Sequence, residues 1–184
     1  MQYRGSGTKP VRDRCLRCPV GWRYSPGLPA RGDGYLGQLA ENGDMDEKEN
    51  DLLRKAREAF ETAYAPYSEY PVGAAIETTA GTVYTGCNIE NANYSNSLHA
   101  EEVAIGKALS EGTREFDRLA VASEARDGVT PCGMCRQTLS EFCGEDFEII
   151  CDTAEGAKRY TLGELIPETI TAAHLDATES GGQR

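Results

Sequence analysis

Two short stretches, His99-Ala100-Glu101 and Pro131-Cys132-Gly133-Met134-Cys135, carry the chemistry of this sequence and open two of its helices. Together they offer one imidazole and two thiols. Three protein ligands is the number found in catalytic zinc sites, which keep the fourth position open for water. Glu101, two residues from His99, remains as a carboxylate for proton transfer. The two stretches therefore predict a zinc centre with an acid–base group beside it.

Each stretch is also expected to begin a helix. His99 and Glu101 fall in the first turn of a predicted helix over residues 98–110, for which Asn96 and Ser97 are candidate N-caps. Cys132 and Cys135 are three residues apart at the start of a second predicted helix, 132–142, so their sulfurs share a face. Both helix N-termini would point at the metal, where their free N–H groups stabilise thiolates.

The flanking sequence alternates between helical and strand patterns. An apolar stripe predicts a helix over 47–64, which Pro66 ends. A hairpin is expected over 72–88, turning at Ala80-Gly81, and residues 89–97 read as a polar loop. Further strands are expected over 116–123, 147–151 and 158–162, with a short helix starting at Leu162. Helices interleaved with five strands predict an α/β layer fold.

The cysteines could instead form a structural zinc site or simply fill the core. A structural site needs a fourth protein ligand, and neither Cys87, Cys143 nor His174 stands at ligand spacing. The pair Cys15 and Cys18 has no second pair nearby, which disfavours a separate zinc knuckle. Spacing therefore favours a catalytic site, while both alternatives stay open.

The charge of the chain is unevenly distributed. The formal net charge is −11, but residues 1–44 carry seven basic and four acidic residues, so residues 45–184 hold −14. The first 44 residues are rich in Gly, Pro and Arg and show no periodicity, so we expect a disordered extension there, with Met45 as a candidate true start. A folded domain is expected over 45–176 and a disordered tail over 177–184.

Composition narrows the class of partner. An acidic domain disfavours nucleic acid, which needs a basic face, and favours a small-molecule substrate. No apolar run reaches the length of a membrane span, and the N-terminus lacks the apolar core of a signal peptide. Seven cysteines without regular disulfide spacing fit a reduced compartment. We therefore expect a cytoplasmic protein with no membrane or nucleic-acid partner.

The motifs resemble those of the cytidine deaminases. H-x-E followed by P-C-x-x-C is the signature of zinc-dependent deaminases. The stretch 65–75, Ala-Pro-Tyr-Ser-Glu-Tyr-Pro-Val-Gly-Ala-Ala, resembles the family's first helix-to-strand junction, and 86–91, Gly-Cys-Asn-Ile-Glu-Asn, resembles its ribose-binding motif. The resemblance runs from about Asp46 to Leu175. It implies a three-layer fold with a mixed five-stranded sheet flanked by helices, one Zn²⁺ per chain, and a homotetramer.

The resemblance also implies roles for individual residues. His99, Cys132 and Cys135 would hold zinc, and Glu101 would carry the proton. Four residues would bind the substrate: Asn88 and Glu90 the ribose 3′-hydroxyl, Tyr70 the pyrimidine ring, and the backbone of Ala100 the base edge. The alternative for Asn88 and Glu90 is a polar loop without a ligand, and for Tyr70 it is ordinary core packing. Arg136 and Gln137 are expected on the helix surface.

Three positions depart from the family pattern. Single-domain members usually have Cys at the position of His99 and Arg at that of Glu102. Three thiolates leave the zinc site at −1, which the Arg offsets, whereas two thiolates and a neutral His leave it neutral. In this sequence His replaces the third Cys and Glu replaces the Arg together, which is what balancing the charge of the zinc site requires. Ile170 stands where the family usually places an aromatic residue that reaches a neighbour's active site.

The function implied is hydrolytic deamination of cytidine and deoxycytidine to uridine and deoxyuridine in pyrimidine salvage, in which zinc-activated hydroxide attacks C4 and Glu101 shuttles the proton. One alternative is a deaminase of a modified cytosine nucleoside of the blasticidin S type. The other is a zinc-binding module without catalysis, which would have no use for Glu101.

Overall fold

The computed structural model describes residues 46–123 and 128–176. The disordered extension predicted over 1–44, the tail over 177–184 and the Cys15/Cys18 pair lie outside the described residues. Within the described part, no helix combines the length and the apolar character that a bilayer crossing requires.

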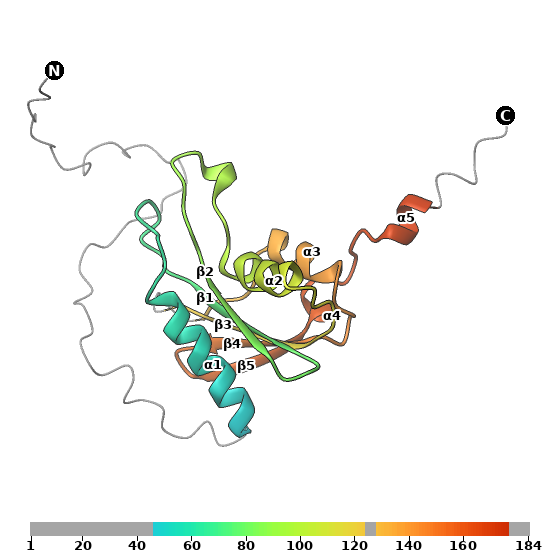
Figure 1. Ribbon diagram of the computed structural model, residues 1–184, viewed down its shortest axis with the longest axis horizontal. Helices are drawn as coiled ribbons and strands as arrows, with labels where there is room; N and C mark the ends of the chain where they lie inside the picture. The colour runs from blue at the N-terminus through green and yellow to red at the C-terminus, as the bar shows by residue number, and fades with distance from the viewer. Residues whose placement is uncertain (1–45, 124–127, 177–184) are drawn as a thin grey trace, which may run out of the picture. The chain divides into compact units, whose positions relative to one another are not determined.

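A five-stranded mixed sheet forms the centre of the described part (Figure 1). The strands are β1 (Gly73–Thr78), β2 (Val83–Cys87), β3 (Phe116–Ala122), β4 (Glu148–Thr153) and β5 (Gly156–Thr161), in the order β2-β1-β3-β4-β5. Only the β3–β4 pair is parallel; the other three pairs are antiparallel. The parallel pair needs a crossover connection, which contains the second metal motif.

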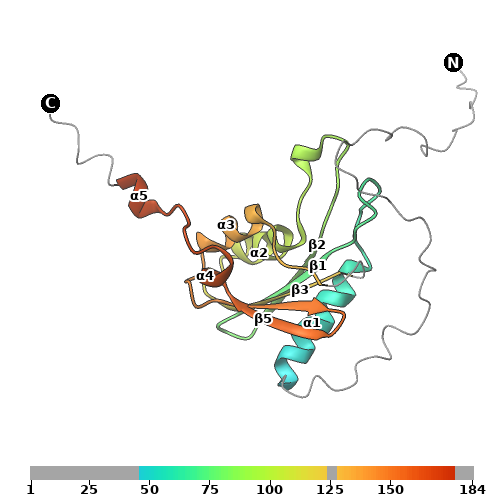
Figure 2. The same ribbon diagram turned by 180° about the vertical axis from the view of Figure 1, so that it is seen from behind.

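Helices cover both faces of the sheet and make three layers, as Figure 2 shows from the opposite side. The long helix α1 (Glu47–Phe60) packs on one face. The other face carries α2 (Ala100–Ser110), α3 (Gly133–Ser140) and the short α4 (Leu162–Leu165), while α5 (Ala172–Asp176) follows near the end of the described chain. The predicted fold class is confirmed.

Alternation along the strands separates two apolar cores. Ala74, Ile76, Leu119 and Val121 point toward α2 and α3, whereas their neighbours Ala75, Ala120 and Ala122 pack with α1. Since successive strand residues face opposite sides, this pattern fixes the register of the central strands. The sheet therefore holds α2 and α3, which carry the metal motifs, on the same face.

Two devices fix α1. Asp46 and Glu49 form a capping box, in which each side chain accepts from the other's backbone N–H at 2.7–2.8 Å. Arg57 donates two hydrogen bonds of 2.8 and 2.6 Å to the fully buried carboxylate of Asp152 on β4. Breaking such a buried pair from one side costs about 3–5 kcal/mol. Helix α1 is thus tied to the centre of the sheet.

Helix α1 is shorter than predicted. It ends at Phe60 rather than at residue 64, because Tyr64 joins an extended pairing instead. The Tyr64 N–H donates to the Asn88 carbonyl at 3.0 Å, and the Tyr64 carbonyl accepts from the Glu90 N–H at 2.8 Å. These partners of Tyr64 lie more than 20 residues away in the sequence, so the local helical periodicity could not predict that the helix ends before Tyr64.

Candidate metal centre and active site

Three ligand atoms converge at one point between α2 and α3. The Cys132 Sγ lies 3.2 Å and the Cys135 Sγ lies 3.3 Å from the His99 Nδ1, and the two sulfurs are 3.5 Å apart. Among the described residues, these three form the one group of His, Cys, Asp or Glu side chains arranged to hold a metal ion. The structure therefore brings together all three predicted ligands.

Both ligand-bearing helices begin at a ligand. His99 is the N-cap of α2 and Cys132 is the N-cap of α3, each with extended backbone angles. Their carbonyls accept the first helical hydrogen bonds, from Val103 and Arg136 at 3.0 and 2.9 Å. The N-termini of both helices consequently lie at the metal site, where the positive ends of the helix dipoles favour negatively charged thiolates.

The predicted N-caps of α2 were wrong. Ser97 is engaged elsewhere, because its Oγ accepts from the Asn91 N–H at 3.0 Å. His99 occupies the cap, and the Glu102 carboxylate accepts from the His99 N–H at 3.2 Å. Ser and Asn are preferred over His at N-cap positions, so local sequence preference favours residues 96 and 97. His99 occupies the cap because there its imidazole can meet Cys132 and Cys135, which are distant in the sequence.

A glycine lets α2 approach the sheet. A Cβ at Gly86 of β2 would lie 2.3 Å from the Ala100 carbonyl oxygen and 2.5 Å from the Ala104 nitrogen. Any larger residue would push the first turn of α2 away from β2. This close contact sets the depth at which His99 and Glu101 sit.

The donor set fits zinc. With bonds of about 2.3 Å to sulfur and about 2.0–2.1 Å to nitrogen, tetrahedral ligand atoms lie roughly 3.5–3.8 Å apart, within a few tenths of an ångström of the observed spacing. One imidazole nitrogen has a single lone pair or a single proton, so it cannot bond well to two thiols at once. A shared cation explains why both sulfurs approach the same Nδ1.

Glu101 lies buried beside these ligands, with 5% of its surface exposed. Burial raises the pKa of its carboxyl above the ordinary range, and hydrogen bonds to its own backbone and to Cys135 offset only part of this. Burial also raises the pKa of the Cys135 thiol, as does the charge of Glu101. A buried carboxyl of this kind is suited to holding and releasing a proton.

Asn88 and Glu90 follow β2 and contact the segment before β1. The Asn88 side chain accepts from the Val72 N–H at 2.9 Å and donates to the Tyr70 carbonyl at 2.9 Å. The Glu90 carboxylate accepts from the backbone N–H groups of residues 67 and 68 at 2.7 and 3.1 Å. Both side chains therefore shape the 65–72 segment, whatever else they bind.

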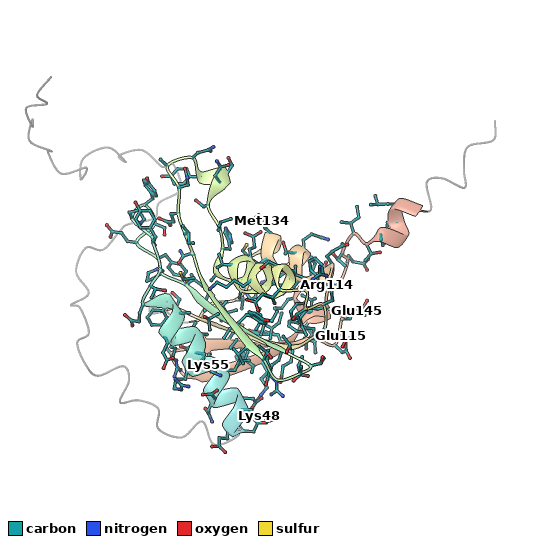
Figure 3. The ribbon with its side chains drawn as sticks, in the orientation of Figure 1. Lys48, Lys55, Arg114, Glu115, Met134 and Glu145 are labelled. Atoms are coloured by element: carbon teal, nitrogen blue, oxygen red, sulfur yellow. The ribbon has the colours of Figure 1, made fainter. Side chains whose placement is uncertain are left out.

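The other two predicted substrate-binding residues are Tyr70, in the segment before β1, and Ala100, at the start of α2. Tyr70 is half-buried and follows Glu69, whose φ of 53° places it in the left-handed region. Ala100 is almost fully buried at the first position of α2. Met134, labelled in Figure 3, lies between Cys132 and Cys135 in the sequence, and its side chain is 50% exposed.

Comparison with known proteins agrees with this geometry. A family model described as the cytidine and deoxycytidylate deaminase zinc-binding region matches residues 46–151. The chain is 43% identical over 125 residues to a cytidine deaminase of Sporosarcina psychrophila, covering 67% of this chain and 92% of that protein. It is 40% identical over 126 residues to a cytidine deaminase of Halalkalibacterium halodurans, covering 68% and 96%. The chain belongs to the cytidine deaminase family.

A solved structure extends the likeness to three dimensions. The crystal structure of the cytidine deaminase from Burkholderia pseudomallei superposes with a TM-score of 0.64 at 38% sequence identity. The match covers 68% of this chain and all of that chain. The expected zinc cofactor is consistent with the family and with the donor set of His99, Cys132 and Cys135.

Arg136 and Gln137 were wrongly predicted to lie on the helix surface. In this member of the cytidine deaminase family both are half-buried and bonded to the C-terminal segment. The Gln137 amide donates to the Ile170 carbonyl at 3.0 Å and accepts from the Thr169 hydroxyl at 2.9 Å. The only sequence signal was the position of Arg136, one residue after a ligand. Ile170, at the family's aromatic position, has a side chain that is 59% exposed.

Proposed function

We propose that this chain catalyses zinc-dependent hydrolytic deamination of cytidine and deoxycytidine, giving uridine or deoxyuridine and ammonia. The observation that carries the proposal is the convergence of two thiols on the His99 Nδ1 with the buried carboxyl of Glu101 beside them. The relatives at 40–43% identity are cytidine deaminases.

Zinc, when bound, supplies a Lewis acid that activates water at neutral pH. Glu101 accepts a proton from the attacking water and delivers it to N3 of the pyrimidine ring. In a second transfer, Glu101 takes the proton of the new C4 hydroxyl and delivers it to the amino group, so that C4 becomes a carbonyl and ammonia leaves. Burial raises the pKa of the Glu101 carboxyl, which helps it to hold a proton between one transfer and the next.

Four residues are proposed to bind the nucleoside. Asn88 and Glu90 would hold the ribose 3′-hydroxyl, Tyr70 would pack near the ring, and the Ala100 backbone would bond the base edge. Hydrogen bonds at the Glu90 carboxylate lower its pKa against the opposing effect of burial, which keeps it an anionic acceptor at neutral pH. The bonds from Asn88 and Glu90 to the 67–72 segment hold Tyr70 beside them.

The homotetramer implied by the family resemblance stays a proposal, and exposed apolar side chains support an interface between copies of the chain. Near the site, large apolar side chains that are 42–73% exposed come from three segments: Tyr64, Tyr67, Ile89, Tyr94, Leu98 and Met134. The rings of Tyr67 and Tyr94 make an edge contact, with centroids 5.9 Å apart. A patch of this kind is typical of a protein interface. Light scattering of the purified protein tests the assembly, and a monomeric mass would contradict it.

A role in pyrimidine salvage in the cytoplasm is proposed from the nucleoside substrate. The absence of a cluster of basic side chains in the proposed binding motifs disfavours phosphorylated substrates, which need cationic partners. A modified cytosine nucleoside of the blasticidin S type is not favoured, since the relatives at 40–43% identity are cytidine deaminases. A zinc module without catalysis would leave the buried Glu101 without a role.

A substrate panel tests the proposal. The purified zinc-loaded protein is incubated with cytidine, deoxycytidine, cytidine monophosphate and free cytosine, and ultraviolet absorbance follows the loss of the amino group. We expect turnover of both nucleosides and poor turnover of the nucleotide and the base. Absence of turnover with either nucleoside would reject the activity.

The proposed ribose contact has its own test. Glu90→Ala should reduce turnover of cytidine far more than turnover of free cytosine, because only the nucleoside carries the hydroxyl that Glu90 would bind. Glu61→Ala, an exposed acid after α1, is the matched control and should change neither. An equal loss on both substrates would mean that Glu90 only shapes the 65–72 segment.

A further inference from the structure

The side chain of Arg136 makes three hydrogen bonds, two to the segment just before α3 and one to the end of α4. Its Nε donates to the Pro131 carbonyl at 2.7 Å, its Nη1 to the Leu165 carbonyl at 2.8 Å, and its Nη2 to the Thr130 hydroxyl at 3.2 Å. A guanidinium is a planar fork of five donors, so it can hold several acceptors in a fixed arrangement. A lysine at the same place would offer a single nitrogen.

Arg136 bonds to the backbone on both sides of Cys132. Its side chain binds the carbonyl of the preceding residue, Pro131, while its backbone N–H donates to the carbonyl of Cys132 itself at 2.9 Å. Cys135 is its neighbour in sequence. Arg136 therefore fixes the orientation of the peptide groups on both sides of Cys132. It also directly follows Cys135, the other thiol ligand, in the sequence.

Cys132 needs such support more than Cys135 does. The Cys135 side chain is fully buried in the core, whereas Cys132 is exposed. Gly133 and Met134, which follow Cys132, are exposed as well, and a Cβ at Gly133 would have no neighbour within 4 Å. Side-chain packing therefore does little to fix the backbone next to Cys132, and hydrogen bonds must do so.

The hydrogen bond from Arg136 to the Leu165 carbonyl connects the start of α3 to the sheet through α4. Leu165 is the last residue of α4, where helical carbonyls lack partners within the helix. Helix α4 follows directly from β5, starts with a capping box between Thr161 and Glu164, and buries Leu162. The guanidinium therefore links the start of α3 to an element that is itself fixed to the sheet.

We propose that Arg136 is a positioning residue for the metal centre: it holds Cys132 in ligand geometry and thereby slows the loss of zinc. The inference rests on the zinc site of the proposed function but not on the deamination reaction. Groups that orient metal ligands from behind typically change metal affinity by about 10–100-fold when they are removed. For Arg136 the effect falls mainly on Cys132, the exposed ligand.

The test measures zinc release in the absence of substrate. Wild-type protein, Arg136→Met and Arg136→Lys are mixed with excess chromogenic chelator, and absorbance follows the zinc set free. Methionine keeps most of the apolar stem but donates no hydrogen bond. We expect release to be about 10-fold faster or more for Arg136→Met, with an intermediate rate for Arg136→Lys.

The matched control is Arg159→Met. Arg159 also makes a two-bond guanidinium contact, donating to Glu49 at 2.7 Å twice, but it links β5 to α1 rather than to the metal motif. This variant should release zinc at the wild-type rate. Thermal unfolding of the metal-free proteins reports any general loss of stability in each variant.

Two results would overturn the inference. The first is wild-type zinc release from Arg136→Met. The second is faster release that Arg159→Met matches at an equal loss of metal-free stability, which would make the effect a general one. If Arg136→Met does not fold, Arg136→Lys and Thr130→Val decide by the same measurement. Lack of deaminase activity in the wild type would reject the proposed function and leave this test intact.

Discussion

At the scale of single residues, the properties of Glu101 come from its surroundings rather than from its type. The neighbouring carboxylate of Glu102 on α2 lies nearer the surface, while Glu101 is buried against the metal ligands. Burial favours the protonated carboxyl, and a nearby dication favours the ionised form. The two influences oppose each other, which suits a group that must accept a proton and release it within one cycle.

Glu101→Gln tests this role. Glutamine keeps the shape of the side chain but cannot transfer a proton, so we expect turnover to fall by about 10²-fold or more. Zinc content and thermal stability should stay close to those of the wild type, since the ligands are untouched. Glu102→Gln is the control, because glutamine preserves the capping box of α2. Near-normal turnover in zinc-loaded Glu101→Gln would remove Glu101 from the mechanism.

Residues whose chemistry is local could be predicted from the sequence, whereas those whose role depends on distant partners could not. His99, Cys132 and Cys135 were predicted from their residue types together with the H-x-E and P-C-x-x-C motif pair of zinc-dependent deaminases. Arg136 was assigned to the surface because nothing near it in sequence shows that Leu165, 29 residues later, lies within its reach. Ser97 is a good N-cap by type, but its hydroxyl bonds to Asn91 instead.

At the scale of elements, the start of α2 combines a metal ligand with a helix cap. Glu102, whose family counterpart is usually an arginine, accepts a hydrogen bond from the His99 N–H at 3.2 Å. Its carboxylate therefore supports the same residue whose imidazole faces the metal. A substitution at 102 changes both the local charge and the cap.

A double-mutant cycle separates these effects. His99→Cys alone turns a neutral ligand into a thiolate, so the site becomes more negative, zinc becomes a weaker Lewis acid, and peak turnover should drop. Glu102→Arg alone should help little or reduce activity, because it removes the cap. Together the two changes should show a favourable coupling of about 1–3 kcal/mol in turnover.

The cycle is measured as kcat/KM for cytidine in four proteins with equal metal content. Additive effects would mean that charge compensation is absent and that Glu102 acts only as a cap. Thermal unfolding of Glu102→Arg gives the cost of the lost cap separately, expected at about 0.5–2 kcal/mol.

The contact of α1 with β5 predicts a pH-dependent stability. Hydrogen bonds from Arg159 hold the pKa of the Glu49 carboxyl below its ordinary value against the opposing effect of burial. A lowered pKa in the folded state gives stability that is present above the unfolded-state pKa and is lost as the pH falls through the folded-state value. Glu49→Gln keeps the cap acceptor for Asp46 but removes the charge.

We expect Glu49→Gln to lower the free energy of unfolding by about 1–2 kcal/mol at pH 7, with the difference shrinking as the pH falls below about 4. Urea unfolding at several pH values measures it. Glu58→Gln, in an exposed pair with Arg54 on the same helix, should cost less than about 0.5 kcal/mol. A cost for Glu49→Gln that does not change with pH would contradict the charge-based explanation.

The main helices and strands could be predicted from the periodicity of the sequence, whereas the pairing of the strands with one another could not. The apolar stripe of α1 and the β-prone segments of β1 to β5 are local patterns. The order β2-β1-β3-β4-β5 depends on which strands meet, and α1 ended early because Tyr64 pairs with Ile89. Long-range pairing is set by packing over the whole sheet, which one sequence window does not contain.

At the scale of the whole molecule, charge is the dominant feature. The residues from Met45 onward carry a net −14, and the buried residues of the apolar clusters in the described part lie wholly between residues 52 and 162. A chain that starts at Met45 should therefore fold and turn over cytidine like the full chain. Equal melting temperature and kcat in the two proteins are the expected results, and loss of either would assign a role to residues 1–44.

The same charge predicts a response to salt. Repulsion among the excess acidic groups destabilises the folded state, and added salt screens it. The free energy of unfolding should rise as potassium chloride increases. Sucrose, which carries no charge, separates screening from general solute effects. A steady fall in stability with potassium chloride would contradict this account.

The metal ligands are far apart in the order in which the chain is made. His99 precedes Cys132 by 33 residues, and α3 lies in the crossover between β3 and β4, so the sheet that α3 packs on is complete only after β4, which ends at Thr153. During translation the imidazole therefore emerges long before the sheet that fixes the thiols can close. The complete three-ligand site can therefore form only after most of the chain has been made. Nascent chains stalled after Ser140 should retain no zinc on gel filtration, whereas released full-length chains should retain it.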